Sequence, residues 1–402
     1  MRAVIILIIS FVFISLIDLY FYKSIKSVFN AAVYKSAIYN IVFFAISLSA
    51  IVLLLLAYFK MDLPNKPFSV NYFYLFLGFI VLFYLPKLQV VSYHFIEDIL
   101  SLFFVRYKII TKIGFVFAIV VFVLVLHGIF INKYNFKVRE QIIFFDNLPQ
   151  EFDNYKIIQI SDMHIGSFHN NIDKVEEIVV LINNENPDLV VFTGDMISNV
   201  AEEINEFLPA LSKIKSKDGK ISILGNHDYG EYVAWKTEEQ KNNNIEELAE
   251  KERSIGFVLL ENQNYRIEKA NSSIIIAGVE NWGKPPFAQY GDLKKALHNT
   301  DTNDFVVLLT HDPSHWRGEI LDKTNIDLTL SGHTHAMQFG FELGTWQWSP
   351  VQYKYKEWGG LYSENDRYLY VNRGTGFLGF PGRVGIRPEI TKIILKRKNK
   401  SS

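Results

Sequence analysis

The chain has 402 residues, more than one ordinary domain holds, and its 41 Lys and Arg nearly balance its 42 Asp and Glu. The charges are unevenly placed, because residues 1–136 carry 11 basic and 4 acidic side chains whereas residues 137–402 carry 30 and 38. The second part therefore lacks the basic excess that nucleic-acid binding requires, and the absence of cysteine excludes disulfides, thiolate metal sites and thiol nucleophiles.

Residues 1–136 are predicted to form an all-α transmembrane region in contact with the lipid bilayer. Crossing about 30 Å of hydrocarbon takes about 20 mainly apolar residues. Four segments meet this requirement: Ala3–Tyr22, Ile38–Phe59, Tyr72–Val91 and Ile113–Ile131. The Lys and Arg residues that flank them divide evenly between the two sides, so the positive-inside rule does not choose an orientation. We expect a multi-pass protein of the cell membrane, with residues 137–402 in the cytoplasm.

Three features of this region allow other interpretations. The first segment could be a cleaved signal peptide, although it is long and no small-residue cleavage site follows it. Pro86 interrupts the third segment, which would also suit a re-entrant or interfacial element. The stretch His94–Lys108 mixes apolar and charged residues, as a surface amphipathic helix or an ordinary loop helix does.

Residues 137–402 are predicted to form a domain with buried strands that each end in a polar motif. Continuous apolar, β-branched runs of this length suit strands that are covered on both faces. These runs are Tyr155–Ser161, Asp188–Thr193, Lys220–Leu224, Phe305–Thr310 and Ile326–Ser331, with Ser273–Gly278 as a further strand that has no such motif. Apolar residues at helical spacing from Ile172 to Ile182, and the polar helix Asn243–Arg253, alternate with the strands. The pattern predicts an α/β fold whose motifs converge at the carboxyl ends of the strands.

The polar motifs supply seven candidate metal ligands: Asp162, His164, Asp195, Asn226, His311, His333 and His335. Carboxylate, imidazole and amide ligands without sulfur suit Mn²⁺, Fe or Zn²⁺, and the set is too rich in nitrogen for Mg²⁺ or Ca²⁺ alone. In an extended segment, residues i and i+2 point to the same side, so Asp162 with His164, and His333 with His335, can each reach one metal. Neighbouring glycines let the backbone approach closely.

The order of these motifs, D-x-H, GD, GNHD, H and GHTH, resembles that of the calcineurin-like metallophosphoesterase superfamily. The resemblance covers about residues 150–397. The opening Asp162–Gly166 resembles that of YkuE-like enzymes, and the four preceding spans resemble the group described as transmembrane proteins with a metallophosphoesterase domain. The tail motifs Tyr370–Gly374, Pro381–Arg383 and Pro388–Ile390 resemble that group as well. One departure is visible, because the group usually has two glycines where this chain has Ala336 and Met337.

The resemblance implies a four-layer α/β/β/α sandwich that binds two divalent metal ions, with Mn²⁺ favoured over Fe or Zn²⁺. In the family pattern Asp162, His164 and His335 hold one metal, Asn226, His311 and His333 hold the other, and Asp195 bridges them. His227 lies beside Asn226 in the sequence and is expected to be the general acid, with Asp228 orienting its imidazole. Arg373, Arg383 and Arg387 could reach substrate phosphates or be structural.

The expected function is phosphoester hydrolysis on a lipid-linked phosphate or pyrophosphate. By resemblance, the leading substrate is UDP-2,3-diacylglucosamine, a nucleotide-lipid of lipid A synthesis, and the alternative is a phospholipid or a broad range of phosphodiesters. A catalytically inactive membrane scaffold is a competing class, but such a protein would be expected to lose ligands. Transport is another, but the spans hold few ionisable residues, namely Asp18 and Lys87. The aromatic stretch Trp346–Trp358 suits either a lipid-facing loop or a cap over the domain.

Overall fold

The computed structural model of the chain describes residues 2–61, 68–105, 108–169, 171–285, 287–344 and 346–398. The chain divides into two compact units. The first, here called the helical unit, comprises Met1–Ile131 and Gly379–Val384. The second, here called the sheet unit, comprises Asn132–Leu378 and Gly385–Ser402. A short C-terminal segment therefore belongs to the helical unit, although it lies far from the helices in the sequence.

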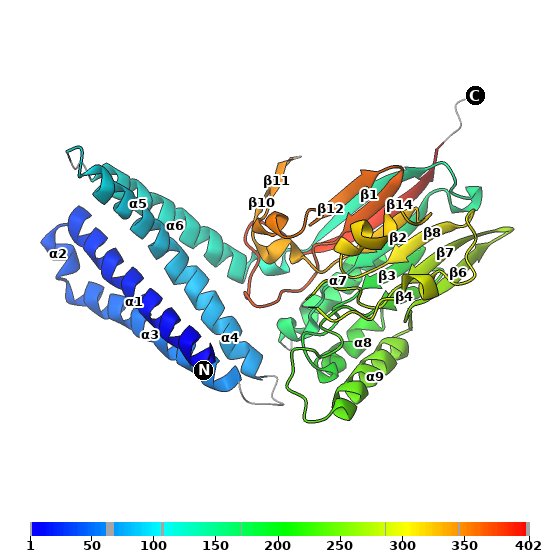
Figure 1. The fold of residues 1–402 in the computed structure, drawn as a ribbon, viewed down its shortest axis with the longest axis horizontal. Coiled ribbons are helices and arrows are strands. Elements are labelled where there is room, and N and C mark those ends of the chain that lie inside the picture. The colour runs from blue at the N-terminus through cyan, green and yellow to red at the C-terminus, as the bar shows by residue number, and fades with distance from the viewer. Residues whose placement is uncertain are drawn as a thin grey trace. The chain divides into compact units, whose positions relative to one another are not determined.

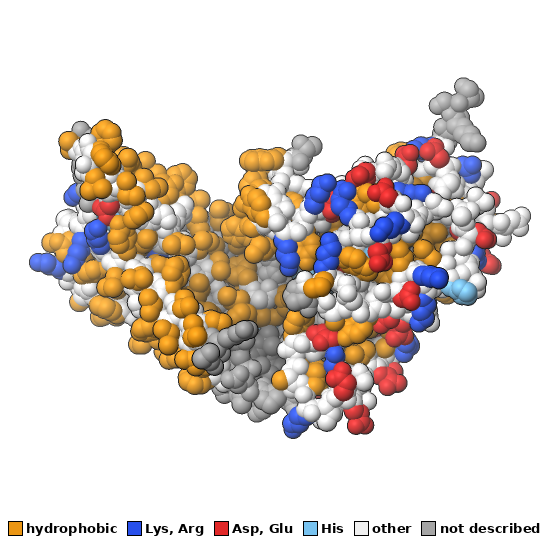
Figure 2. Space-filling view, viewed as in Figure 1, with side chains coloured by type: hydrophobic (Ala, Val, Ile, Leu, Met, Phe, Trp, Pro, Cys, Tyr) orange, Lys and Arg blue, Asp and Glu red, His pale blue; other side chains and the backbone are white. Residues whose placement is uncertain are grey.

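The helical unit consists of long apolar helices. Its helices are α1 (Arg2–Val28), α2 (Ala31–Tyr34), α3 (Ala37–Met61), α4 (Phe68–Phe79), α5 (Leu85–Leu100) and α6 (Ile109–Phe130) (Figure 1). Among the described residues, four stretches are long and apolar enough to cross a membrane: Val4–Val28, Ala37–Phe59, Tyr72–Leu100 and Ile109–Tyr134. Figure 2 shows hydrophobic side chains over the surface of this unit, as contact with lipid requires. The prediction of four apolar helices is confirmed.

The third span contains a proline without being broken by it. A π-helical turn, Ile80–Tyr84, joins α4 to α5 immediately before Pro86. The wider turn accommodates the missing N–H and the bulk of the proline ring. The helix then continues to Leu100, with His94 and Glu97 buried. Residues 94–100 therefore continue the third helix, so neither of the two alternatives, a surface helix or a loop helix, begins at His94; Arg106 and Tyr107 lie outside the described residues.

The sheet unit contains two six-stranded mixed sheets. The first has the order β1-β14-β2-β3-β4-β5, with bounds β1 Lys137–Phe145, β14 Glu389–Arg397, β2 Tyr155–Ile160, β3 Leu189–Thr193, β4 Lys220–Ile223 and β5 Phe257–Leu259. The second has the order β12-β13-β9-β8-β7-β6, with bounds β12 Gly360–Glu364, β13 Arg367–Val371, β9 Leu328–Ser331, β8 Phe305–Leu309, β7 Ser272–Gly278 and β6 Gln263–Lys269. A small hairpin, β10 (Phe341–Leu343) and β11 (Trp346–Trp348), lies apart from both sheets (Figure 1).

Three apolar clusters hold the sheet unit together as four layers. Between the sheets, side chains such as Ile157 and Val191 of the first pack with Val307 and Leu328 of the second. The outer face of the first sheet packs against α7 (Ile172–Asn184) and α9 (Glu238–Ser254), and α8 (Leu208–Leu211) joins the same cluster. The outer face of the second sheet packs against α10 (Leu293–Ala296) and a π-helical turn, Trp316–Ile320. This is the predicted α/β/β/α sandwich.

One buried ion pair links two helices of the helical unit. Lys87 Nζ lies 2.6 Å from Asp18 Oδ1, and the Tyr84 hydroxyl donates to Asp18 Oδ2 at 2.9 Å. Both charged side chains are almost completely buried among apolar helices. Charges in such surroundings are stable only when they are paired.

We predict that Asp18→Leu lowers the free energy of unfolding by on the order of 3–5 kcal/mol, because Lys87 is left as an uncompensated buried charge. The double variant Asp18→Leu/Lys87→Leu should recover much of this loss. Unfolding of the full-length protein in detergent micelles measures both. A double variant less stable than either single variant would contradict this explanation, because removal of the unpaired Lys87 should restore stability.

Candidate functional site

The candidate ligands leave the carboxyl ends of five parallel strands. Asp162 and His164 follow β2, Asp195 follows β3, Asn226 follows β4, His311 follows β8, and His333 and His335 follow β9. The registers place these ends level with one another, since Ile160 pairs with Phe192, Thr193 with Ile223, and Leu309 with Leu330. Short loops from both sheets therefore meet at one edge of the sandwich, as the sequence predicts.

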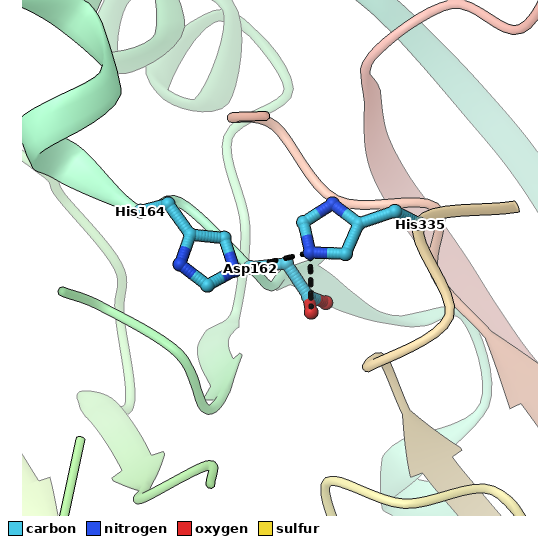
Figure 3. Close-up of side chains that lie close together, drawn as sticks. All are labelled: Asp162, His164 and His335. Carbon is cyan, nitrogen blue, oxygen red and sulfur yellow. Dashed lines mark hydrogen bonds and ion pairs between the residues drawn. The ribbon is translucent and has the colours of Figure 1, made fainter. Parts of the chain in front are cut away.

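A first group of ligand atoms comes from Asp162, His164 and His335, which lie within 4.8 Å of one another and are buried (Figure 3). His335 Nε2 is 3.0 Å from His164 Nε2 and 3.3 Å from Asp162 Oδ1. Two imidazole nitrogens and a carboxylate oxygen that face one point form a donor set that fits a divalent cation.

A second group comes from Asp195, His311 and His333. Asn226 extends it, because its Oδ1 lies 2.8 Å from His333 Nδ1. Asp195 Oδ2 is 3.1 Å from His311 Nε2 and also 3.5 Å from His164 Nε2, so one carboxylate oxygen faces both groups. His311 Nε2 is buried, and Asp195 Oδ2 is its close polar neighbour. A buried imidazole nitrogen that faces a buried carboxylate oxygen is a second observation that fits a bound cation.

The end of β3 and the loop after it fix the orientation of three imidazoles through their backbone carbonyls. Nδ1 of His311, His164 and His227 lies 2.7, 3.2 and 2.7 Å from the carbonyl oxygens of Thr193, Ile197 and Ser198, respectively. A carbonyl oxygen only accepts, so each Nδ1 donates its proton and Nε2 is left to act in the site. Such outer contacts set the tautomer that a metal ligand needs.

Asp228 holds this loop in place. Its buried carboxylate accepts hydrogen bonds from the backbone N–H groups of Asp195 at 2.7 Å, Ile197 at 3.1 Å and Gly225 at 2.8 Å. The expectation that Asp228 orients the imidazole of His227 is therefore corrected, because the His227 ring bonds to the Ser198 carbonyl instead. Asp228 instead holds the backbone that carries Asp195 and the carbonyls of Ile197 and Ser198.

The candidate ligands adopt a backbone conformation that most residues avoid. Asp162, His164, Asp195, His333 and His335 have φ of 48°, 40°, 61°, 72° and 49°. Left-handed residues other than glycine cost on the order of 1–3 kcal/mol each and cluster at functional sites. The strain continues through Ala336 and Met337, at φ 48° and 52°, where the family usually has glycine. Ala336 is buried, whereas Met337 is 59% exposed beside the site.

Burial and mutual interaction set the protonation states of the site. Burial lowers the pKa of His164 to about 3, so this imidazole is neutral. Burial also raises the pKa of Asp162, to about 6, although the charge of His311 partly offsets the effect. Burial opposes protonation of His311, but Asp195 and Asp162 outweigh it and raise its pKa to about 10. Two buried carboxylates thus require a positive partner, which a metal ion supplies in place of this proton.

Sequence analysis missed two aromatic residues that support the ligands. The Tyr355 hydroxyl lies 2.8 Å from His333 Nε2, and the Tyr232 hydroxyl accepts a hydrogen bond from Asn226 Nδ2 at 2.8 Å. The aromatic stretch that contains Tyr355 was visible in the sequence, but its contact with a ligand was not. Among the candidate arginines, Arg373 pairs with Glu389 at 2.7 Å, and Arg387 donates hydrogen bonds to Asn135 and Phe136. Arg383 is fully buried.

Comparisons with known proteins agree with this geometry. A family described as calcineurin-like phosphoesterase matches residues 155–337, and one described as the probable transmembrane domain of a calcineurin-like phosphoesterase matches residues 1–133. The chain is 30% identical over 280 residues to the uncharacterised metallophosphoesterase YkuE of Bacillus subtilis, covering 67% of this chain and 89% of YkuE.

Two further relatives match different shares of the chain. A zebrafish (Danio rerio) transmembrane protein with metallophosphoesterase domain is 30% identical over 269 residues, covering 65% of this chain and 57% of the relative. The chain thus matches less than two thirds of that relative's length. An uncharacterised metallophosphoesterase of Campylobacter jejuni is 27% identical over 390 residues, covering 95% of this chain and 96% of the relative.

We predict that Asp228→Ala lowers the free energy of unfolding by about 3 kcal/mol or more, because three buried N–H groups lose their acceptor at about 1–3 kcal/mol each. The variant should also lose bound metal, since the β3 loop is released. Thermal unfolding and metal content of the full-length protein measure the two effects. Asp322→Ala, which removes an exposed aspartate, is the matched control. Unchanged stability and metal content in Asp228→Ala would contradict the assigned clamp.

Proposed function

Since the chain belongs to the calcineurin-like metallophosphoesterase family, we propose that its seven clustered side chains hold two divalent metal ions and that the protein hydrolyses phosphoesters at the membrane. The family uses a dinuclear divalent metal site. Asp162, His164 and His335 would hold one ion, and Asn226, His311 and His333 the other. The observation that carries this proposal is the position of Asp195, whose Oδ2 lies 3.5 Å from His164 Nε2 and 3.1 Å from His311 Nε2, as a bridging ligand would.

Two such ions would acidify a bound water and stabilise the charge on the phosphoryl group. We assign general acid catalysis to His227. Its Nδ1 is fixed on the Ser198 carbonyl, and the ring lies partly exposed, 4.9 Å from the His164 ring between centroids. Nε2 is thus the nitrogen available to protonate the leaving oxygen. Asp228 is a positioning residue that acts through the backbone of Asp195. Mn²⁺ is the proposed metal.

The proposed substrate is an amphiphilic phosphoester. Residues 1–136 keep the catalytic residues 137–402 at a membrane, and the β10–β11 hairpin carries two exposed apolar side chains, Leu343 at 65% and Trp346 at 63%. Exposed apolar side chains on a hairpin of a membrane-bound enzyme suit contact with lipid. UDP-2,3-diacylglucosamine is the leading candidate, and a phospholipid or a broad range of phosphodiesters is the alternative. We place the catalytic part in the cytoplasm, which protease accessibility in oriented vesicles tests.

A catalytically inactive scaffold is the competing proposal. The retention of all seven ligands, five of them in a strained backbone conformation, favours catalysis, because a scaffold has no need for buried carboxylates at positive φ.

We predict that purified full-length protein hydrolyses bis-p-nitrophenyl phosphate with Mn²⁺ and loses this activity on chelation. Asp195→Ala should remove activity and at least one metal ion, because it deletes the ligand shared by both groups. Release of p-nitrophenolate and metal content are the measurements. Full activity in Asp195→Ala would refute the dinuclear proposal.

We predict that His227→Ala lowers kcat by about 10²–10⁴-fold for an alkyl leaving group, which must be protonated, and far less for p-nitrophenolate, which leaves without a proton. Metal content should stay near that of the wild type. An equal loss for both leaving groups would assign His227 a role other than general acid.

We predict that Leu343→Ser/Trp346→Ser raises KM several-fold for a long-chain lipid phosphate in vesicles, because the hairpin loses apolar contact with the lipid surface. Hydrolysis of a soluble diester should stay unchanged. Val258→Ser/Tyr265→Ser, which changes two other exposed apolar residues at 41% each, is the matched control. Equal KM values for the two double variants on vesicles would exclude the hairpin from lipid contact.

A further inference from the structure

We propose that a basic pocket beside the candidate metal centre binds a second anionic group of the substrate, so that the preferred substrates are diphosphate esters instead of esters with a single phosphate. This inference rests on the proposed hydrolysis and adds a binding site to it. The basic pocket is defined by Lys284, Arg317, Lys354 and Lys356, with Phe287 and Tyr355 on its wall.

The basic pocket is a cavity of about 340 Å³ within the sheet unit. Its volume is at the lower end of the range for small-ligand sites, about 300–1,000 Å³. Such a volume suits a small charged group more than a whole lipid or nucleotide.

The basic pocket keeps a net positive charge, although Glu357 also lines it. Arg317 pairs with Glu357 at 2.7 Å and with Glu364 at 2.9 Å, so its charge is compensated. Lys284, Lys354 and Lys356 have no ion pair within the described part of the chain. The surrounding residues 137–402 have an acidic excess, with 38 Asp and Glu against 30 Lys and Arg. Three uncompensated lysines around one cavity of an acidic domain create a local field that favours an anion.

Two aromatic side chains connect the basic pocket to the candidate metal centre. The Phe287 and Tyr355 rings lie 5.0 and 5.4 Å from the His333 ring, between centroids. Lys354 Nζ lies 5.1 and 5.2 Å from the centroids of the same two rings. Contacts of an ammonium with aromatic faces hold the charge in place. One lysine is therefore positioned a single ring away from a candidate metal ligand.

This proximity identifies the chemical class of the anion. A phosphoryl group at the metal centre has its neighbouring group within reach of the basic pocket, and lysine binds phosphate as a point charge. In a diphosphate ester, water adds to the phosphorus at the metal centre and the bond from this phosphorus to the bridging oxygen breaks. The bridging oxygen leaves with the electron pair on the second phosphate, which the lysines hold. The two protons of water end on the two product phosphates or in solvent.

Binding of non-hydrolysable probes tests the pocket without requiring activity. The full-length protein in detergent micelles is titrated by calorimetry with diethyl methylenediphosphonate, which carries two anionic groups, and with ethyl methylphosphonate, which carries one. We expect Lys354→Ala/Lys356→Ala to raise Kd for the diphosphonate by about tenfold more than for the monophosphonate, a moderate effect because both lysines are exposed. Lys354→Arg/Lys356→Arg, which keeps the charge, should retain binding.

The matched control is Lys294→Ala/Lys295→Ala, which removes two neighbouring lysines from a separate cavity of the same unit. This control removes as much positive charge as the pocket variant does, but from another place on the unit. It should therefore leave both Kd values unchanged. Equal weakening in the control and the pocket variant, or no weakening in the pocket variant, would overturn the proposal.

Kinetics then separate this inference from the proposed function. The substrates are ethyl p-nitrophenyl phosphate, which releases p-nitrophenolate, and the diphosphate with one ethyl and one p-nitrophenyl end, in which cleavage at the bridging oxygen gives ethyl phosphate and p-nitrophenyl phosphate. Phosphorus NMR measures the products of both reactions. We expect the pocket variant to raise KM for the diphosphate by at least about tenfold more than for the monophosphate, with kcat nearly constant. A wild type that binds the diphosphonate through the lysines but hydrolyses neither substrate would refute the function and leave the site. A wild type that hydrolyses both, with equal effects of the variant on each, would refute the site and leave the function.

Discussion

The carboxylate of Asp228 is the group on which the rest of the site depends. It accepts three backbone hydrogen bonds from the loops after β3 and β4, and so fixes the backbone of Asp195 and Ile197. The fixed loop in turn presents the carbonyls that orient His164 and His227, and the adjoining end of β3 presents the one that orients His311. One buried carboxylate therefore supports the direction of two of these imidazoles through the backbone. Such outer contacts commonly set ligand basicity and orientation as strongly as the choice of ligand.

The site has an energetic cost, because several of its residues hold a strained backbone conformation. Five candidate ligands have positive φ, and Ala336 and Met337 extend the strained stretch without the help of glycine. The surrounding structure must over-determine this conformation, and the buried contacts of Ala336 with Val351, Trp358 and Ile386 are one means. Ala336 and Met337 thus hold a conformation that glycine adopts more readily, and the exposed Met337 side chain lies beside the ligands.

Sequence alone predicted the parts of the fold that depend on continuous apolar runs. The strands before Asp162, Asp195, Asn226, His311 and His333 are central and buried on both faces, so their composition identifies them. Edge and returning strands such as β1, β6, β12 and β14 were missed, because their burial is partial or their partners are distant in the sequence, as for Lys137 beside Glu389. The roles of Asp228 and Tyr355 could not be predicted from the sequence either. Asp228 contacts the backbone of another loop, and Tyr355 contacts a side chain of another loop.

The central claim is that Asp195 joins two metal ions into one site. Electron paramagnetic resonance of the full-length protein reconstituted with Mn²⁺ tests it most directly, because two ions that share a carboxylate are magnetically coupled. The account predicts two Mn²⁺ per chain and the spectrum of an exchange-coupled pair. One Mn²⁺ per chain, or two ions that give the spectrum of isolated Mn²⁺, would contradict it.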